Sequence, residues 1–203
     1  MAEIKIKIAG VILAAGAGRR MGGAEGTKLL LPFRDVPLLS HVVRKALVVC
    51  DPVLAVVGCN ARQVTSTLNG INARLRIVHA HDWHEGQSRS LRAGLAALEP
   101  DVAGVLVFLG DQPLIRSNTS AALAAMFRNH PDSFIAPCHE GKRGNPVCIP
   151  RTWFSRVMNL QGDTGARCVL NHPDAMLRLV QVDDPGVLRD IDSPEDYNAL
   201  RDI

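Results

Sequence analysis

The fold follows from the stretch Val11-Ile12-Leu13-Ala14-Ala15-Gly16-Ala17-Gly18-Arg19-Arg20-Met21-Gly22-Gly23, which has Lys28 shortly after it. An apolar run that ends in glycines predicts a buried strand whose carboxyl end opens into a loop. Glycines let successive backbone N–H groups converge on phosphate oxygens, and Arg19, Arg20 and Lys28 add positive charge. An ordinary glycine-rich turn would account for the glycines but not for the basic residues. The stretch therefore favours a phosphate-binding loop at the end of the first strand.

Two other kinds of phosphate loop do not fit this stretch. A Walker A loop ends in Gly-Lys-Ser/Thr, whereas the order here is Gly26-Thr27-Lys28 with no hydroxyl residue after the lysine. The dinucleotide fingerprint requires a small third residue, and Met21 stands in that place. A nucleotide-binding loop of a different kind remains.

Composition restricts the class of protein. The chain has 203 residues, of which 47% are apolar and 21% are charged, and this is enough for one domain over residues 1–203 with a substantial core. A formal net charge of +3 is too small for a nucleic-acid footprint, and no apolar run is long enough to span a membrane. We therefore expect neither a nucleic-acid partner nor a membrane partner, and we find no signal peptide.

The cysteines favour a reducing compartment. Their number is odd, they lie far apart, and none forms a Cys-x-x-Cys pair: Cys50, Cys59, Cys138, Cys148 and Cys168. This pattern argues against a disulfide framework and against a structural zinc site. We therefore expect a cytoplasmic protein.

Apolar runs and helical periodicities alternate along the first half of the chain. After the first strand, the patterns predict helices over residues 38–47, 60–68, 91–98 and 119–126, and strands over residues 52–57, 75–78 and 102–109. Asn60 precedes Gln63 by three residues, an arrangement that predicts a capping box at the start of its helix. The alternation of strands and helices predicts a mostly parallel sheet.

The second half predicts a small antiparallel element and an acidic tail. Residues 134–137 and 144–149 read as two strands with hairpin character, and residues 177–182 as a later strand. Helices are predicted over residues 153–160 and 166–170, the second with a cap in the segment 162–165. Residues 187–192 read as a strand that ends in two aspartates, and Ser193 with Asp196 predicts a capping box on the helix that follows.

Acidic residues follow two of the predicted strands. Asp111 comes directly after the strand over residues 102–109, and ligands of open parallel sheets sit at the carboxyl ends of strands. A carboxylate there suits a divalent ion such as Mg²⁺, although an Asp-Gln-Pro turn would also explain the residue. Asp190 and Asp192 alternate along an extended segment, so both carboxylates could face one ion.

Two polar clusters have a structural and a functional interpretation. Ser88 and Ser90 stand at the start of the helix over residues 91–98, where hydroxyl groups can cap the helix or bind an anion, a base or a sugar. His79, His81 and His84 invite a metal interpretation. Because no further ligand accompanies the histidines, a polar loop is the favoured explanation.

Six segments in order resemble the MobA-like nucleotidyltransferase family, and within it the molybdenum cofactor cytidylyltransferases: Leu13-Ala14-Ala15-Gly16-Ala17-Gly18-Arg19-Arg20-Met21-Gly22 with Lys28, Gly86-Gln87-Ser88-Arg89-Ser90-Leu91, Gly110-Asp111-Gln112-Pro113, Arg143-Gly144-Asn145-Pro146-Val147, Gly162-Asp163-Thr164-Gly165-Ala166-Arg167 and Asp190-Ile191-Asp192-Ser193-Pro194-Glu195-Asp196. The resemblance spans nearly the whole chain. It implies a three-layer α/β/α fold of the nucleotide-diphospho-sugar transferase type, with a Rossmann-like, mostly parallel sheet. It also implies transfer of a nucleoside monophosphate from a triphosphate to a phosphorylated acceptor.

The resemblance further implies a set of site residues. The catalytic residues would be Arg20, Lys28 and Asp111, and Mg²⁺ would bind Asp111 together with Asp192 or, slightly less favoured, Asp190. Acceptor-binding residues would be Gln112, Gly144, Asn145, Pro146, Asp163 and Gly165. Nucleotide-binding residues would be Leu13, Ala14, Ala15, Gly16, Gly18, Arg20, Gly22, Lys28, Gly58, Gly86, Ser88, Ser90 and Gly110.

The base, the acceptor and the partner are implied in the same way. Ala15 favours CTP over GTP, because its methyl group narrows the space for a purine. The acceptor would be molybdopterin, and the product would pass to a molybdenum hydroxylase of the xanthine dehydrogenase type. A GTP-dependent guanylyltransferase, an enzyme acting on a sugar or polyol phosphate, and a non-enzymatic nucleotide-binding cofactor chaperone are the alternatives. The chain departs from the family pattern in residues 24–27, which lengthen the spacing before Lys28, and in Asn145, where many relatives have histidine.

Overall fold

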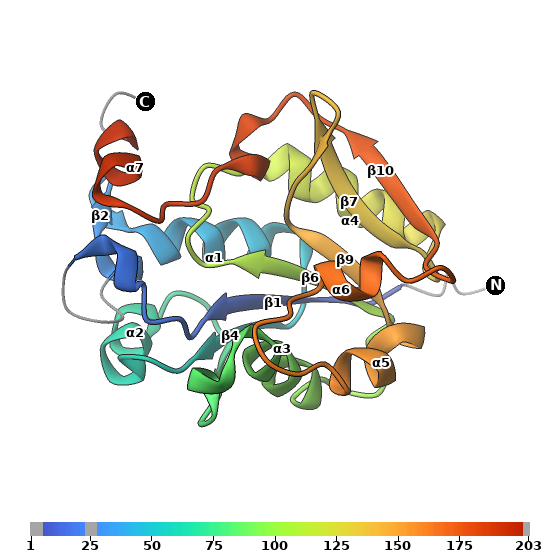
Figure 1. Ribbon diagram of the computed structural model, residues 1–203, viewed down its shortest axis with the longest axis horizontal. Helices are drawn as coiled ribbons and strands as arrows, with labels where there is room; N and C mark the ends of the chain where they lie inside the picture. The colour runs from blue at the N-terminus through green and yellow to red at the C-terminus, as the bar shows by residue number, and fades with distance from the viewer. Residues whose placement is uncertain (1–5, 23–27, 201–203) are drawn as a thin grey trace.

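Figure 1 shows the computed structural model, which describes residues 6–22 and 28–200. A central sheet carries helices on both faces, so the expected three-layer α/β/α architecture is confirmed. The strands of this sheet are β1 (Ile8–Ala14), β4 (Val53–Val57), β5 (Leu75–His79), β6 (Gly104–Leu109), β7 (Phe134–His139), β8 (Lys142–Arg143), β9 (Val147–Pro150) and β10 (Leu177–Gln181). A separate antiparallel pair consists of β2 (Pro32–Phe33) and β3 (Val36–Pro37). The helices are α1 (Leu38–Val49), α2 (Ala61–Leu68), α3 (Gln87–Ala96), α4 (Ser117–Asn129), α5 (Phe154–Met158), α6 (Arg167–Leu170) and α7 (Pro194–Ala199).

The parallel half of the sheet brings several strand ends to one edge. The strand order is β10-β7-β9-β6-β1-β4-β5, and β1 is parallel to both β4 and β6. Leu13 of β1 lies beside Leu109 of β6, and Ala14 lies beside Val57 of β4. Because these strands end level with one another, the loops that follow them open at the same edge.

Both faces of the sheet are buried, because the central strands are apolar on both sides. Ile12 of β1 belongs to the core that also contains Leu39 of α1 and Phe127 of α4. Its neighbour Val11 belongs to the opposite core, with Leu91 of α3. Figure 1 accordingly shows α1 and α4 on one side of the sheet and α3 and α5 on the other. No helix of the described residues is long and apolar enough to cross a membrane.

The predicted antiparallel element lies within the main sheet. β9 pairs antiparallel with β6 and with β7, and β8 pairs antiparallel with β7. β10 then runs parallel to β7 at the sheet edge. The expectation of a mostly parallel sheet with a small antiparallel part is therefore confirmed.

Two local predictions are wrong. Asn60 has a left-handed backbone, and its side-chain amide donates to Gln63 Oε1 at 2.6 Å, so no capping box forms at the start of α2. Residues 187–192 are not a strand: Pro185–Leu188 form a 3-10 turn (η5), which Asp184 caps by accepting from the Gly186 N–H, and the described residues between this turn and α7 contain no strand. The capping box of Ser193 and Asp196 at the start of α7 does form.

The five cysteines are free thiols that differ in exposure. Burial raises the pKa of Cys50 to about 12 and raises the pKa of Cys148 well above its ordinary value, whereas Cys168 is exposed. Since the thiolate is the reactive form, we expect a thiol reagent to modify Cys168 in the native protein and to reach Cys50 and Cys148 only after unfolding. The measurement is a thiol titration with and without denaturant, and Cys168→Ser should remove the fast phase. Rapid native labelling of Cys50, mapped by mass spectrometry, would contradict this prediction.

Candidate active site

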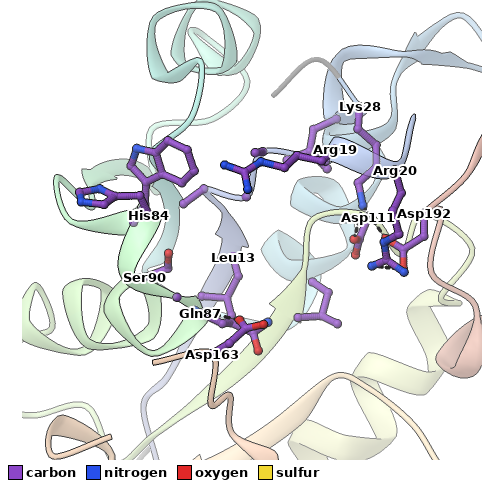
Figure 2. A pocket seen from close by; sticks show the side chains of 18 of the residues that line it. Leu13, Arg19, Arg20, Lys28, His84, Gln87, Ser90, Asp111, Asp163 and Asp192 are labelled. Atoms are coloured by element: carbon purple, nitrogen blue, oxygen red, sulfur yellow. Dashed lines mark hydrogen bonds and ion pairs between the residues drawn. The ribbon is translucent and has the colours of Figure 1, made fainter. Parts of the chain in front are cut away.

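A pocket of about 740 Å³ opens at the edge where β1 and β6 end. Its walls come from the loop after β1, from the start of α3, and from acidic residues after β6 and in the tail. Figure 2 shows the side chains of Lys28, Arg20, Asp111 and Asp192 gathered at one end of the pocket. The pocket brings together these residues that the sequence singled out: Leu13, Ala15, Gly16, Gly18, Arg20, Lys28, Gly86, Ser90, Asp111, Asp163 and Asp192.

Lys28 joins the two acidic positions. Its Nζ lies 2.7 Å from Asp111 Oδ2 and 3.0 Å from Asp192 Oδ1. Arg20 Nη2 lies 2.9 Å from Asp192 Oδ2. The basic residues after β1 and the two carboxylates therefore form one cluster, which we call the ion-pair cluster (Arg20, Lys28, Asp111 and Asp192).

The position of Lys28 depends on Gly18. Gly18 has a positive φ of +62°, and a Cβ at this position would lie 3.1 Å from Lys28 Cβ, so the lysine packs directly against the loop. Burial alone would lower the pKa of Lys28, but the neighbouring Asp111 and Asp192 carboxylates outweigh it and raise this pKa. Lys28 thus remains a cation inside the pocket. Residues 24–27, which lengthen the spacing before it, lie outside the described residues.

Asp111 has one oxygen without a partner in this structure. Its Oδ1 is buried and makes no hydrogen bond, while its Oδ2 contacts Lys28. Divalent ions at phosphate sites are commonly held by one or two carboxylates together with substrate phosphates and water. Over residues 6–22 and 28–200, no three His, Cys, Asp or Glu side chains form a group that could hold a metal ion. Asp111 and Asp192 therefore fit an ion whose coordination a triphosphate completes.

Asp190 belongs to a different pocket from Asp192. It accepts a hydrogen bond from Gln112 Nε2 and lines a second pocket of about 520 Å³. Between the two acids, Ile191 is buried and its N–H donates to the Asp111 carbonyl at 3.0 Å. Of the two tail carboxylates, Asp192 is the one that shares the first pocket with Asp111.

We expect Asp190→Asn to stabilise the protein at neutral pH. Partial burial, and then the neighbouring Asp111, raise the pKa of Asp190 above its usual 3.8. Because the pKa of Asp190 is higher in the folded state than in the unfolded state, ionisation of this carboxyl lowers the free energy of unfolding. This loss of stability is absent below the unfolded-state pKa and complete above the folded-state pKa. The urea midpoint of the variant should exceed that of the wild type at pH 7, and the difference should shrink as the pH falls towards 3.8. A difference that did not change with pH would exclude charge as the cause.

The start of α3 is assembled with a distant segment. Ser88 is fully buried, and its hydroxyl donates to the Gly162 carbonyl at 2.7 Å. Asp163 accepts a hydrogen bond from the Gln87 N–H at 3.3 Å, so it caps α3, whereas α6 has no side-chain cap. The prediction that segment 162–165 caps α6 is therefore wrong. Of the two serines, Ser90 lines the first pocket.

Five predicted nucleotide-binding residues do not line the first pocket: Ala14, Gly22, Gly58, Gly110 and the buried Ser88. Ala14 and Gly110 are buried at the ends of β1 and β6. Gly22 is exposed at the end of the turn η1 (Arg19–Met21), and Gly58 is packed against Trp83. The prediction that these residues contact the nucleotide therefore has no support from the lining of this pocket.

Three of the six predicted acceptor residues line the two pockets. Asn145 and Gly165 line the second pocket, and Asp163 lines both. Gln112, Gly144 and Pro146 are buried and line neither of these two pockets. The second pocket shares Leu13, Gln87, Leu109 and Asp163 with the first, so the two are adjacent.

The histidines do not gather into a metal centre among the described residues. The rings of His79 and His81 stack with their centroids 6.1 Å apart, while His84 lines the first pocket. Sequence reasoning missed Trp83 and His84 as pocket residues. Their position two and three residues before Gly86, which was already expected at the site, is the signal that could have identified them.

The family model of the MobA-like NTP transferase domain matches residues 10–179. The chain belongs to this family. It is 33% identical, over 95% of its length, to the nicotine blue oxidoreductase of Paenarthrobacter nicotinovorans and to the purine catabolism protein PucB of Bacillus subtilis, covering 96% and 95% of those proteins. It is 24% identical to the molybdenum cofactor cytidylyltransferase of Escherichia coli, over 95% of this chain and 94% of that protein.

A solved structure supports the same assignment for this MobA-like protein. The crystal structure of Rv0371c from Mycobacterium tuberculosis superposes with a TM-score of 0.81 at 28% identity, covering 97% of this chain and 99% of Rv0371c. A second structure of Rv0371c, with a TM-score of 0.75 at 27% identity, is a complex with manganese and covers 96% of this chain and 97% of that one. The expected family and fold are thereby confirmed, and with them the class of nucleotidyltransferases.

Proposed function

We propose that this MobA-like protein transfers CMP from CTP to the terminal phosphate of molybdopterin and releases pyrophosphate. The observation that supports this most directly is the ion-pair cluster, where two cations from the glycine-rich side meet two carboxylates in one pocket. A triphosphate needs cations for its oxygens, and a divalent ion needs carboxylates. The relationship to a molybdenum cofactor cytidylyltransferase supports the choice of substrates.

The reaction needs positioning and charge stabilisation more than a reactive side chain. A phosphate monoester has a second pKa of about 6, so the acceptor is largely deprotonated near neutral pH and needs no general base. Its oxygen attacks the α-phosphorus in line, and pyrophosphate leaves. Mg²⁺ held by Asp111 and Asp192 would neutralise charge on the phosphate oxygens. Arg20 and Lys28 would exchange their carboxylate partners for the β- and γ-phosphates.

The base and the acceptor would occupy neighbouring pockets. Ala15 lines the first pocket, and its methyl group is the reason to prefer CTP. The second pocket, lined by the predicted acceptor residues Asn145, Asp163 and Gly165, shares a wall with the first. An acceptor bound there could extend its phosphate into the first pocket. The nucleotide product would then pass to a molybdenum hydroxylase of the xanthine dehydrogenase type in the cytoplasm.

Pyrophosphate release with each of CTP, GTP, UTP and ATP tests this proposal in the presence of Mg²⁺ and molybdopterin. We expect turnover with CTP that requires both the acceptor and the metal. Activity with GTP alone would favour a guanylyltransferase. Activity with a sugar phosphate or a polyol phosphate, and not with molybdopterin, would show that the acceptor is of that class. Nucleotide binding without turnover on any acceptor would favour a cofactor chaperone. A parallel assay of NADH and NADPH oxidation tests whether the chain shares the activity named for its oxidoreductase relative.

A further inference from the structure

Trp83 lines the first pocket from an element that the ion-pair cluster does not use. It is the first residue of the turn η3 (Trp83–Glu85), which follows β5 and precedes α3. Its side chain is half-buried, so one part of the indole is packed while another part remains open to the pocket. Ala15, at the end of β1, lines the same pocket.

Gly58 explains how the indole reaches this position. A Cβ on Gly58 would lie 2.5 Å from Trp83 Cγ, 2.6 Å from Trp83 Cβ and 2.8 Å from Ala15 Cβ. The backbone of Gly58 does not have a positive φ, so the reason for glycine here is space and not conformation. Gly58 therefore allows Trp83 and Ala15, which come from different strand ends, to pack together at one side of the pocket.

The turn that carries Trp83 is tied at both of its ends to one residue of α3. Arg89 of α3 lies 3.3 Å from Asp82, the residue before Trp83, and it also pairs with Glu85 at the end of the turn. These contacts tie η3 to the helix behind it. The orientation of the indole is thus fixed by packing and ion pairs before any ligand enters.

We propose that Trp83 is the aromatic wall of the base subsite, against which the nucleobase packs while Lys28 and Arg20 hold the triphosphate. This inference rests on the proposed function and assigns the base to the side of the pocket lined by Ala15 and Trp83, which pack against Gly58. An aromatic side chain binds any base through its π-face, with a contribution of about 1–3 kcal/mol per base, or roughly 5-fold to 150-fold in affinity. Removal of the indole should therefore weaken binding of a nucleotide but not of a phosphate chain that lacks a base.

Intrinsic fluorescence provides the first test, because the chain has two tryptophans. Trp153 is buried against Phe134, with ring centroids 4.9 Å apart, and does not line the first pocket. In Trp153→Phe, the tryptophan fluorescence comes from Trp83 alone. We expect saturable quenching by CTP with Mg²⁺, and no comparable quenching by inorganic tripolyphosphate with Mg²⁺.

Affinity measurements provide the second test. Calorimetry should show CTP binding about tenfold or more weaker in Trp83→Ala and within about threefold of the wild type in Trp83→Phe, with tripolyphosphate affinity unchanged in both. Gly58→Ala should resemble Trp83→Ala, because the added Cβ displaces the indole, and Trp153→Phe is the matched aromatic control. If Trp83→Ala does not fold, the quenching experiment and the CTP affinity of Trp83→Phe still test whether Trp83 contacts the base.

The outcomes separate this inference from the proposed function. If the wild type does not bind CTP, the proposed function fails. If CTP binds but neither quenches Trp83 nor loses affinity in Trp83→Ala, Trp83 is not at the base and the inference is overturned. Equal losses of affinity for CTP and for tripolyphosphate in Trp83→Ala would assign Trp83 a structural role. This result would also overturn the inference.

Discussion

Replacing Asp111 with asparagine should lower the rate of pyrophosphate release by roughly 10²-fold to 10³-fold, the usual loss when one charge-stabilising group is removed from a reaction centre. Asparagine keeps the size of the side chain and can still accept from Lys28 Nζ, which lies 2.7 Å from Asp111 Oδ2. It removes the negative charge and changes the buried Oδ1 that has no partner in this structure. The loss should therefore appear mainly in kcat, and Mn²⁺ binding followed by electron paramagnetic resonance should weaken as well.

A matched control is available on the surface. Asp183→Asn changes the same functional group at a position whose side chain is 94% exposed and whose nearest ion pair, with Arg116, is 3.8 Å long. This variant should keep wild-type activity and Mn²⁺ affinity. If Asp111→Asn were folded and retained activity within about threefold of the wild type, Asp111 would not belong to the reaction centre.

The strand ends of the site could be predicted from the sequence because local pattern and burial agree there. The apolar runs of β1 and β6 have no polar face, which is typical of a parallel sheet covered on both sides. Both runs end in glycine, so the position of Asp111 at the pocket edge follows from topology alone. The presence of Gly16 and Asp111 in one pocket agrees with this reasoning.

The tail could not be predicted correctly because its partner is not a strand. The alternation of Asp190, Ile191 and Asp192 resembles an exposed strand, and Ile191 is indeed buried. Its backbone N–H, however, donates to the carbonyl of Asp111 in the loop after β6. This contact separates the two acids, so that one meets Lys28 and the other meets Gln112. Such a contact between distant loops leaves no periodic signal in the sequence.

The cap of α3 shows the same limit. Local rules assign a helix cap to a residue that immediately precedes the helix. Here Asp163 accepts from the Gln87 N–H, 76 positions away in the sequence. Ser88, which the local pattern favours, turns its hydroxyl to the Gly162 carbonyl instead. Both contacts are consequences of tertiary packing, and packing determined which of the predicted polar residues face the pocket.

Replacing Lys28 with methionine should strengthen the binding of a divalent metal ion and weaken the binding of the nucleotide. In this structure the ammonium group of Lys28 bridges Asp111 and Asp192, so it occupies the place between the two carboxylates that would hold the metal. A metal ion must therefore displace Lys28, and a displaced Lys28 is free to bind phosphate. This exchange makes metal and triphosphate binding cooperative, with a coupling typically of about 5-fold to 150-fold.

Calorimetry with Mn²⁺ alone, with CTP alone in the presence of a chelator, and with both together measures this coupling. We expect Mn²⁺ alone to bind about tenfold tighter in Lys28→Met than in the wild type. The factor by which metal and CTP increase each other's affinity should fall towards one. Added Mn²⁺ should raise the melting temperature of Lys28→Met more than that of the wild type. The reason is that the variant leaves two neighbouring carboxylates without the lysine that neutralises them. Lys142→Met, at an exposed position on β8, is the control and should change none of these values. Unchanged or weaker Mn²⁺ binding in a folded Lys28→Met protein would show that the lysine does not compete with the metal. It would contradict the idea that Lys28 leaves the two carboxylates for the phosphates when the metal binds.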